Sequence, residues 1–401
     1  LKNAALIPQG SGEAVLVGHN TLRKAVMGTE NREPTPEEME QMKKLLAEGL
    51  EKGAIGMSLG LFYVPGCYAK PEEVLALAQV VAEHGGILAS HIRNEGDQLL
   101  EAVQEYLDVI RASGCRAVFS HHKAAWKENH GKVKKSLAMI DEANAQGADI
   151  YLDVYPYDAS HTSMLARFVP KMFHPEGTTS ALALLDDPAI CEMIKAWGKK
   201  RWGNDLSSAL VTEFPGGEPY EGKTVNEIAD LWGVEDRFEA AFEVIRRSGG
   251  KAQGCYFSMD PEDVAYVIRH PRAMICTDSS VAGTVECYHP RLRAAFPRAL
   301  GRYAREMGVV SIPEMIRKMT ALPAHVYGLS GKGRVAVGMD ADLCIFDPEK
   351  LRDRATYQHC RENNEGLEYV IIDGKVVLTK GVYNGTRAGK VFRREAAGVD
   401  K

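Results

Sequence analysis

A short apolar run followed by a helical segment recurs about every 30 residues in the first part of the chain. Amphipathic segments fill the intervals between apolar runs that begin near residues 54, 86, 116 and 149. The segment that precedes the first of these runs opens with Thr35 as a helix N-cap and Glu38 as its capping-box partner, and it ends at Gly53. Strand and helix units joined by right-handed crossovers make the strands parallel. The repeat therefore predicts an α/β fold, either a TIM-like barrel or a doubly wound sheet.

Polar residues stand at the ends of three apolar runs. The runs over 85–91 and 115–121 both finish in Ser then His, so His91 and His121 occupy equivalent positions. The later run AMICTDSS carries Asp278 near its end. A single strand-end histidine more often packs or forms a surface hydrogen bond, but the C-terminal ends of parallel strands share one face, where βα barrels place their active sites. The repeated placement favours a site that binds a metal ion or uses Asp278 as a ligand or general base.

Alternation along two of the strands adds further candidates. Lys123 shares a strand face with His121, whereas His122 points to the other side. In the run ADIYLDVYPY, one face carries Asp153, Tyr155 and Tyr157. We expect these residues to point into the mouth of the barrel rather than toward the surrounding helices.

The strand and helix repeat is interrupted for more than a hundred residues after Tyr157. An insertion at about 160–250 would lie over the catalytic face, where lids and specificity loops belong, although a purely structural excursion is the alternative. After residue 333, alternating runs divided by Gly and Asp predict β-hairpins. We therefore expect a barrel over 1–333 and a small β-sandwich portion over 334–401.

Composition narrows the class of protein. The net charge is −5 and the pI is near 6.2, without a basic run that would follow a phosphate backbone, so we expect no nucleic-acid partner. No apolar stretch reaches 18 residues, and the eight cysteines form no C-x-x-C pair. This cysteine usage is typical of the reducing cytoplasm, and we expect neither membrane insertion nor export. The oligomeric state has no signal in the sequence.

Seven motifs carry a resemblance to a known family. In chain order they are LVGHNTLRKAVMG, GAIGMSLGLFYVPGCYA, ASHIRNEG, FSHHK, DVYPYDAS, CTDSS and HPRLRAAFPRALGRY. Together they resemble the motifs of the N-acyl-D-amino-acid deacylases, or D-aminoacylases. The segment GKGRVAVGMDADLCIFDP is similar to the one that connects the barrel to the small β-sandwich in enzymes of the amidohydrolase superfamily. The resemblance covers nearly the whole chain and implies a TIM-like barrel of the metal-dependent hydrolase type.

The resemblance also implies roles for individual residues. His91 and His121 correspond to zinc ligands, and Asp278 corresponds to the general base. Lys123, Tyr155 and Arg291 correspond to residues that orient the substrate carboxylate. Tyr256 and Met259 correspond to residues that line the pocket for the substrate side chain. The implied reaction is zinc-assisted hydrolysis of a small N-acyl-D-amino acid. An acidic side chain would need a cation near Met259, and the insertion offers Arg167, Lys171, Lys199, Lys200 and Arg201.

The chain departs from the family at its start. Enzymes of this kind open with sandwich strands, a barrel strand bearing H-x-H and a strand with a metal-ligating Cys. We expect that this sequence begins after them, short by roughly a hundred residues if the complete barrel has about 250. The sequence contains no H-x-H, which leaves two zinc ligands unless His19 or Cys67 substitutes. A catalytically inactive relative is therefore one alternative. A cyclic amidohydrolase of the dihydroorotase or hydantoinase kind is another, although SLGLFYV stands where such enzymes carry a carbamylated Lys.

Overall fold

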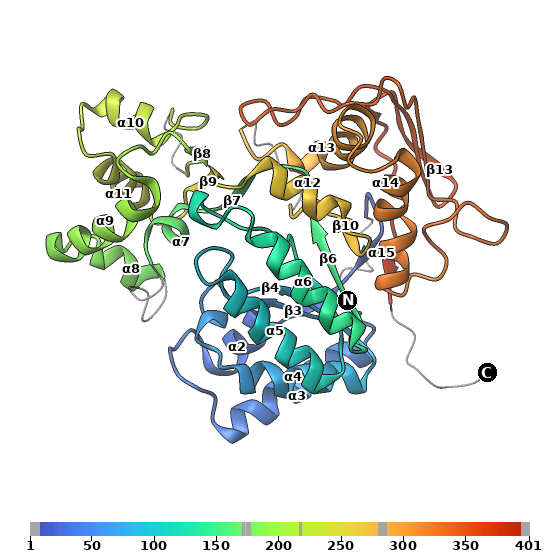
Figure 1. Cartoon of the computed structure of the whole chain (residues 1–401), viewed down its shortest axis with the longest axis horizontal. Helices are drawn as coiled ribbons and strands as arrows, with labels where there is room; N and C mark the ends of the chain where they lie inside the picture. Colours follow the sequence, from blue (N-terminus) through green and yellow to red (C-terminus); the bar gives the residue numbers. More distant parts are fainter. Residues whose placement is uncertain (1–8, 171–172, 174–177, 216–218, 280–286, 394–401) are drawn as a thin grey trace.

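A parallel six-stranded sheet forms the centre of the computed structural model, which describes residues 9–170, 173, 178–215, 219–279 and 287–393 (Figure 1). The strand order is β10–β6–β5–β4–β3–β2, and each neighbouring pair is parallel. Their bounds are β2 (Leu16–Gly18), β3 (Gly56–Gly60), β4 (Ile87–His91), β5 (Arg116–Phe119), β6 (Ile150–Val154) and β10 (Ala273–Ile275). The predicted α/β fold with parallel strands is confirmed.

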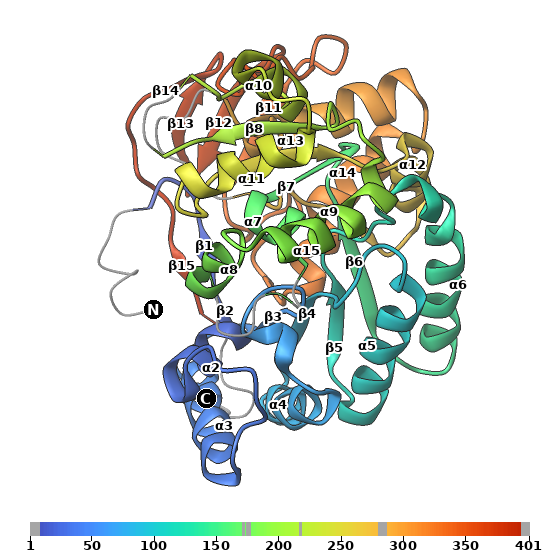
Figure 2. The same cartoon turned by 90° about the vertical axis from the view of Figure 1, so that its left-hand side faces the viewer.

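Helices alternate with the strands and cover one face of the sheet (Figure 2). They are α3 (Pro36–Glu51), α4 (Pro71–Glu83), α5 (Leu99–Ser113), α6 (Lys132–Ala145) and α12 (Pro261–Arg269). Their apolar stripes and the alternate strand residues that face them form the largest hydrophobic core. The capping box predicted at Thr35 and Glu38 is present at the start of α3.

The sequence of residues 13–23 predicts an apolar strand that runs into His19 and continues as a loop, and the loop part of this prediction was wrong. The chain forms β1 (Glu13–Ala14) and β2, and then a helix, α2 (His19–Met27), that begins at His19. In α2 the buried side chains His19, Leu22 and Arg23 recur at helical spacing. The residues that follow Gly18 therefore form a helix rather than a loop.

The other face of the sheet contacts α15 (Ala321–Val326). A small cluster there joins alternate strand residues such as Ile87 and Ala89 of β4 to Leu322 and Val326. The connection from β10 to α15 runs through α13 (Arg291–Arg298), the adjoining π-helical segment Ala299–Glu306 and α14 (Ile312–Met319). Both faces of the sheet are therefore covered, as parallel sheets require.

The insertion is a separate folded unit between β6 and β10, which are neighbours in the sheet. It holds the antiparallel sheet β7–β9–β8, the helices packed on it and its own hydrophobic core. Figure 1 shows these helices to one side of the central sheet. Its elements are β7 (Ala159–Ser163), α7 (Met164–Phe168), α8 (Thr178–Leu184), α9 (Pro188–Trp202), β8 (Ala209–Glu213), α10 (Val225–Trp232), α11 (Arg237–Arg247) and β9 (Gln253–Phe257).

The C-terminal segment adds a four-stranded antiparallel sheet with the order β11–β12–β13–β14. Its strands are β11 (Leu343–Phe346), β12 (Leu367–Ile372), β13 (Lys375–Thr379) and β14 (Val382–Tyr383). The last strand, β15 (Val391–Phe392), returns to pair in parallel with β1. We retain a boundary between residues 333 and 334 as a proposal.

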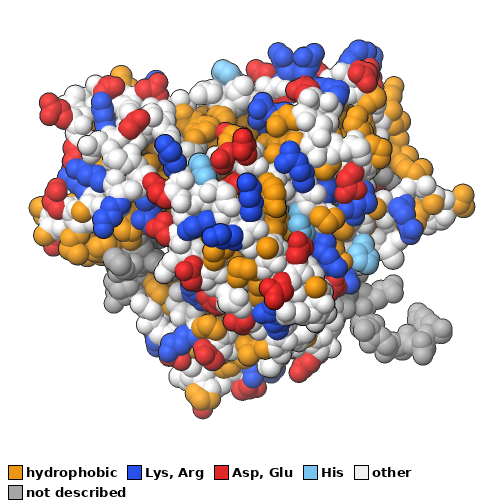
Figure 3. Space-filling model, in the orientation of Figure 1, with side chains coloured by type: hydrophobic (Ala, Val, Ile, Leu, Met, Phe, Trp, Pro, Cys, Tyr) orange, Lys and Arg blue, Asp and Glu red, His pale blue; other side chains and the backbone are white. Residues whose placement is uncertain are grey.

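The surface carries charges of both signs. In the view of Figure 3, acidic and basic side chains are interspersed over the visible face. A search of the described part of the chain found no helix both long enough and apolar enough to cross a membrane.

Candidate metal centre and active site

A cleft of about 1020 Å³ opens at the carboxyl ends of the central strands. One wall is formed by the loops that follow β3, β4 and β5, and the opposite wall by β7, α7 and α9 of the insertion. Residues singled out in the sequence line it, namely His91, His121, Lys123, Tyr155 and Asp278. The size suits a small molecule, since ligand pockets commonly enclose about 300–1,000 Å³.

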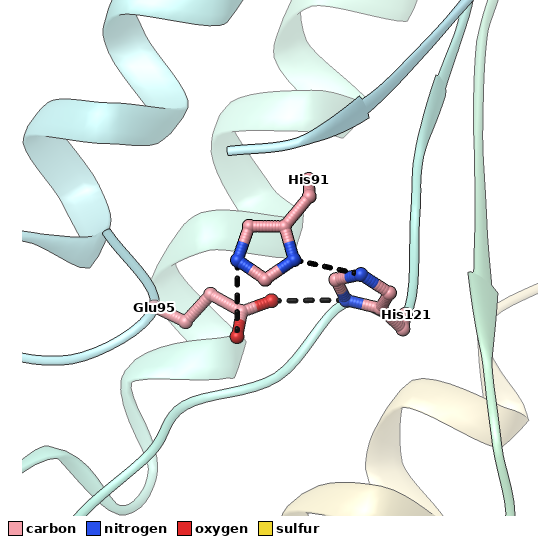
Figure 4. A group of neighbouring side chains, drawn as sticks. All are labelled: His91, Glu95 and His121. Carbon is pink, nitrogen blue, oxygen red and sulfur yellow. Dashed lines mark hydrogen bonds and ion pairs between the residues drawn. The ribbon is translucent and has the colours of Figure 1, made fainter. Parts of the chain in front are cut away.

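The two predicted histidines lie in direct contact at the base of the cleft (Figure 4). His91 Nδ1 and His121 Nε2 are 2.9 Å apart, and Glu95 approaches the other nitrogen of each ring. Glu95 Oε1 lies 3.0 Å from His121 Nδ1, and Oε2 lies 3.9 Å from His91 Nε2. One ligand atom from each residue falls within 4.8 Å of the others. Imidazole and carboxylate groups at this spacing fit a divalent metal such as zinc.

Burial favours the uncharged form of the His91 ring. Loss of solvation lowers the pKa of His91 to about 3, because a buried ring is harder to charge. A neutral imidazole keeps a lone pair on one nitrogen, and this is the form that binds metals.

The ends of the strands hold two of these residues in unusual backbone conformations. His121 has a φ of 40° and Asp278 a φ of 45°, in the left-handed region that costs a non-glycine residue about 1 kcal/mol or more. The backbone N–H of His121 donates to Asp153 Oδ1 over 2.6 Å, which fixes the turn. Such strain is common at functional sites, so the fold supports the interpretation of both residues as site residues.

Asp278 forms an ion pair with Arg291 across 2.8 Å, although the angle is not that of a hydrogen bond. Burial raises the pKa of Asp278, but the positive charges of His121, Arg291 and Lys123 outweigh it and hold the pKa below its usual value. The carboxylate is therefore ionised at neutral pH and can accept a proton. Its side chain is 36% exposed, so it remains open to the cleft.

The predicted carboxylate-binding residues gather around Tyr155. The guanidinium carbon of Arg291 lies 4.4 Å from the centre of the Tyr155 ring, and Lys123 Nζ lies 5.4 Å from it. Lys123 also contacts Glu95 Oε1 over 2.6 Å. Two cations and a phenol thus flank the histidine pair, an arrangement able to hold an anionic group of a ligand.

The two residues predicted to line the side-chain pocket have different positions. Met259 is buried against Tyr155, whose hydroxyl lies 3.9 Å from Met259 Sδ. Tyr256 belongs to the core of the insertion and is 1% exposed. Between Tyr256 and the cleft lies Arg167, whose guanidinium carbon is 5.1 Å from the centre of the Tyr256 ring. Tyr256 therefore packs against Arg167, which lines the cleft, and is not itself among the residues that line the cleft.

His19 and Cys67, considered as replacement ligands, also line the cleft. His19 Nε2 lies 2.8 Å from Glu73 Oε1 in a buried group that includes Arg23, and it ties α2 to α4. Within the residues that the structure describes, only His91, Glu95 and His121 meet as a potential metal-binding group of three.

Sequence reasoning missed Glu95 and did not single out Arg167. Glu95 follows His91 by four residues within ASHIRNEG, and this His-x-x-x-Glu spacing was the available signal. Arg167 was one of five cations in the insertion, of which Lys171 lies outside the described residues. No local pattern distinguished it from the others.

A sequence profile of the amidohydrolase family matches residues 13–378. The chain belongs to the amidohydrolase family. An N-acyl-D-glutamate deacylase of Alcaligenes xylosoxydans xylosoxydans is 37% identical to it over 384 residues, which are 96% of this chain and 70% of that relative. A D-aminoacylase of the same organism is 33% identical over 97% of this chain and 72% of the relative.

Solved structures extend the similarity to the fold. The N-acyl-D-glutamate deacylase of Bordetella bronchiseptica, complexed with zinc and a phosphonate inhibitor, is 34% identical to this amidohydrolase, with a TM-score of 0.80. The match covers 96% of this chain and 72% of that one. Similarity to cyclic amidohydrolases is much shorter, since a D-hydantoinase of Rhizobium radiobacter matches 22% of this chain at 30% identity. The relationship to the cyclic enzymes is therefore distant.

Proposed function

We propose that this amidohydrolase hydrolyses the amide bond of N-acyl-D-amino acids and releases a free D-amino acid and a carboxylate. The observation that carries the proposal is the convergence of a carboxylate, two imidazoles and an ammonium group on a single cleft, with a guanidinium group paired to the carboxylate. Amide hydrolysis needs a proton acceptor beside an activated water, and the substrate carboxylate needs cations. The names of the relatives describe the same class of reaction.

His91 and His121 would hold the metal, and zinc is the ion we propose. Imidazole nitrogens suit it as ligands, and a zinc complex is known for a relative. When bound, zinc polarises a carbonyl group and lowers the pKa of a water ligand toward about 7.

The residues of this chain then have separate tasks. Asp278 accepts the proton of the attacking water and returns it to the leaving amine. Arg291 and Lys123 hold the substrate α-carboxylate above the Tyr155 ring, which directs the amide toward the histidine pair. The Arg291 and Asp278 ion pair gives way when a substrate carboxylate takes its place at Arg291.

The side chain of the substrate is proposed to be acidic, as in N-acyl-D-glutamate. Arg167 lies in the cleft wall, 3.9 Å from the centre of the Trp126 ring, and donates to Ser258 Oγ over 3.0 Å. Ser258 precedes Met259, so this is the cation near Met259 that an acidic side chain requires. Burial lowers the pKa of Arg167 to about 10, and none of the described carboxylates forms an ion pair with it. A desolvated cation without a counter-ion would be stabilised by a substrate carboxylate.

Arg167→Met should therefore reverse the preference for acidic substrates. We expect kcat/KM for N-acetyl-D-glutamate to fall roughly 10- to 150-fold, which corresponds to about 1.5–3 kcal/mol for a charged hydrogen bond. The kcat/KM for N-acetyl-D-methionine should stay the same or rise. Arg201→Met is the matched control, since Arg201 lines the same cleft but already pairs with Asp97 over 2.8 Å. An equal loss on both substrates in Arg167→Met would contradict the assignment.

The proposal is tested by assaying amine release from both enantiomers of N-acetyl-glutamate and N-acetyl-methionine, with hydantoin and dihydroorotate as cyclic competitors. Hydrolysis of the D-enantiomers alone is expected. Turnover of a cyclic amide instead would place the protein with the cyclic enzymes. If metal-loaded protein turned over none of these substrates, the result would favour a catalytically inactive relative.

The proposed partner is the small-molecule substrate, and the proposed location is the cytoplasm. The location rests on the cysteine pattern, and seven of the eight thiols are buried or half-buried rather than exposed.

A further inference from the structure

We propose that Glu95 is a positioning residue of the metal site, which holds His91 and His121 in the tautomers that bind metal without being a ligand itself. The inference rests on the proposed function and deepens it. It concerns which of the four ring nitrogens face the metal, and the contacts of the two rings decide this.

The nitrogens fall into an inner and an outer pair (Figure 4). The inner pair, His91 Nδ1 and His121 Nε2, face each other across 2.9 Å. The outer pair, His91 Nε2 and His121 Nδ1, both face the Glu95 carboxylate, at 3.9 Å and 3.0 Å. A metal bound by both rings needs free lone pairs on the inner nitrogens, so each outer nitrogen must carry the proton of its neutral ring.

Glu95 meets this requirement because an ionised carboxylate only accepts hydrogen bonds. Oε1 lies 3.0 Å from His121 Nδ1 and Oε2 lies 3.9 Å from His91 Nε2, so a proton on either outer nitrogen faces a negative charge. The same contacts argue against Glu95 as a ligand. Its oxygens approach the outer nitrogens, on the opposite side of each imidazole from the inner pair.

Lys123 keeps Glu95 charged at this buried position. Its ammonium group donates to Oε1 over 2.6 Å, which compensates the negative charge beside the histidines. Lys123 Nζ is also 2.6 Å from His121 Nδ1, and it could donate there only if that nitrogen lacked a proton. That competing arrangement moves the proton to Nε2 and blocks metal binding. Glu95 Oε1 accepts from the same ammonium group and thereby competes with His121 Nδ1 for it, which favours the tautomer protonated at Nδ1.

The loop that carries Glu95 is fixed to the loop that carries His121. The Glu95 carbonyl accepts the backbone N–H of Ala125 over 2.7 Å. Asn94 Oδ1 accepts the N–H of Gly96 over 2.8 Å, which closes a tight turn. A Cβ at Gly96 would lie 3.0 Å from Trp126, so the close approach of the two loops favours glycine there. These contacts place the carboxylate before any metal binds, as a positioning role requires.

The test measures metal affinity and coordination separately. Co²⁺ binding to the whole protein is followed by chelator competition, and the visible spectrum of the Co²⁺ form reports the number and type of ligands. Glu95→Ala should weaken Co²⁺ binding by about 10- to 100-fold, as for other carboxylates that orient metal-binding histidines, without changing the spectrum of the loaded protein. Glu95→Gln should recover part of the affinity, because its carbonyl oxygen can still accept the N–H of His121.

A third variant and a second readout exclude a general structural effect. Glu101→Gln removes an exposed charge from α5 and should leave Co²⁺ affinity unchanged. In the Zn²⁺-loaded protein, the imidazole N–H of His121 should give a low-field NMR resonance that exchanges slowly with water. Glu95→Ala should lose this resonance to exchange, and Glu101→Gln should keep it.

Three outcomes would overturn the inference. A changed Co²⁺ spectrum in Glu95→Gln would make Glu95 a ligand. An affinity within twofold of the wild type in Glu95→Ala, with the His121 resonance intact, would leave Glu95 no role in the site. A wild-type protein that takes up neither ion would reject the proposed metal site together with the inference, whereas the first two outcomes reject the inference alone.

Discussion

Asp278→Asn is expected to lower kcat for N-acyl-D-amino acid hydrolysis by roughly 10²- to 10⁴-fold, the usual contribution of a general base. The substitution keeps the shape of the side chain but removes its ability to accept a proton. Asp278 can take this role because its lowered pKa keeps the carboxylate ionised at neutral pH and its side chain stays open to the cleft. Steady-state kinetics with N-acetyl-D-glutamate on an active preparation would measure the effect.

The other parameters of the same variant separate chemistry from binding. The metal content should be unchanged, and KM should not rise, because the amide releases Arg291 from its ion pair and leaves it for the substrate carboxylate. Asp97→Asn is the matched control, since Asp97 lines the same cleft but interacts with Arg201 and Asn129 rather than with Arg291. Near-normal turnover in Asp278→Asn would remove this residue from the role of base.

The convergence of the candidate residues at the strand ends could be predicted because it follows from local pattern. Apolar runs of strand length alternate with helical periods, and a parallel sheet brings the carboxyl ends of its strands to one edge. His91 ends β4 and His121 lies two residues beyond the end of the neighbouring strand β5, so topology brings them to the same edge of the sheet. Their 2.9 Å contact also depends on the turn at His121, which the repeat does not encode.

Residues supplied by the loops could not be ranked from sequence in the same way. Arg167 becomes distinctive only because Trp126, Tyr256 and Ser258, from two distant segments, surround it. Glu95 acquires its role because its loop is attached to the segment after β5. Such contacts join residues with unrelated spacing, and no period in the sequence encodes them. The insertion showed the same limit, since no sequence pattern marked the half-buried cation that it places in the cleft wall.

The pairing of Asp278 with Arg291 was likewise not anticipated, and it changes how substrate binding is understood. Each residue had been assigned a separate role by the resemblance to the deacylases. The structure brings the two side chains together across 2.8 Å. Binding of a substrate carboxylate at Arg291 would therefore expose the proton acceptor at the same moment, which couples recognition to catalysis.

Arg291→Ala should lower kcat/KM for N-acyl-D-amino acids by roughly 30- to 1000-fold. The substitution removes a charge-assisted contact with the substrate α-carboxylate that is worth about 2–4 kcal/mol when bidentate and desolvated. Arg291 fits this role because it is buried and has donors without hydrogen-bond partners among the described residues, at the Nε and Nη1 atoms. Nε can therefore donate to a substrate carboxylate, and Nη1 becomes available once the ion pair with Asp278 opens.

Stereoselectivity should decline with the same substitution. The substrate is held at three points: its carboxylate at Arg291, its amide at the histidine pair and its side chain toward Met259. Three fixed points can be matched by one enantiomer only. Loss of the first point lets the L-enantiomer present its amide almost as well, so the ratio of kcat/KM for D- over L-substrate should fall. Arg293→Ala is the control, because Arg293 is exposed and its guanidinium donates to the Arg361 carbonyl over 3.2 Å. If Arg291→Ala kept full D-selectivity and kcat/KM, the carboxylate would have to bind elsewhere, and Lys123, 5.4 Å from the centre of the Tyr155 ring, would be the first site to examine.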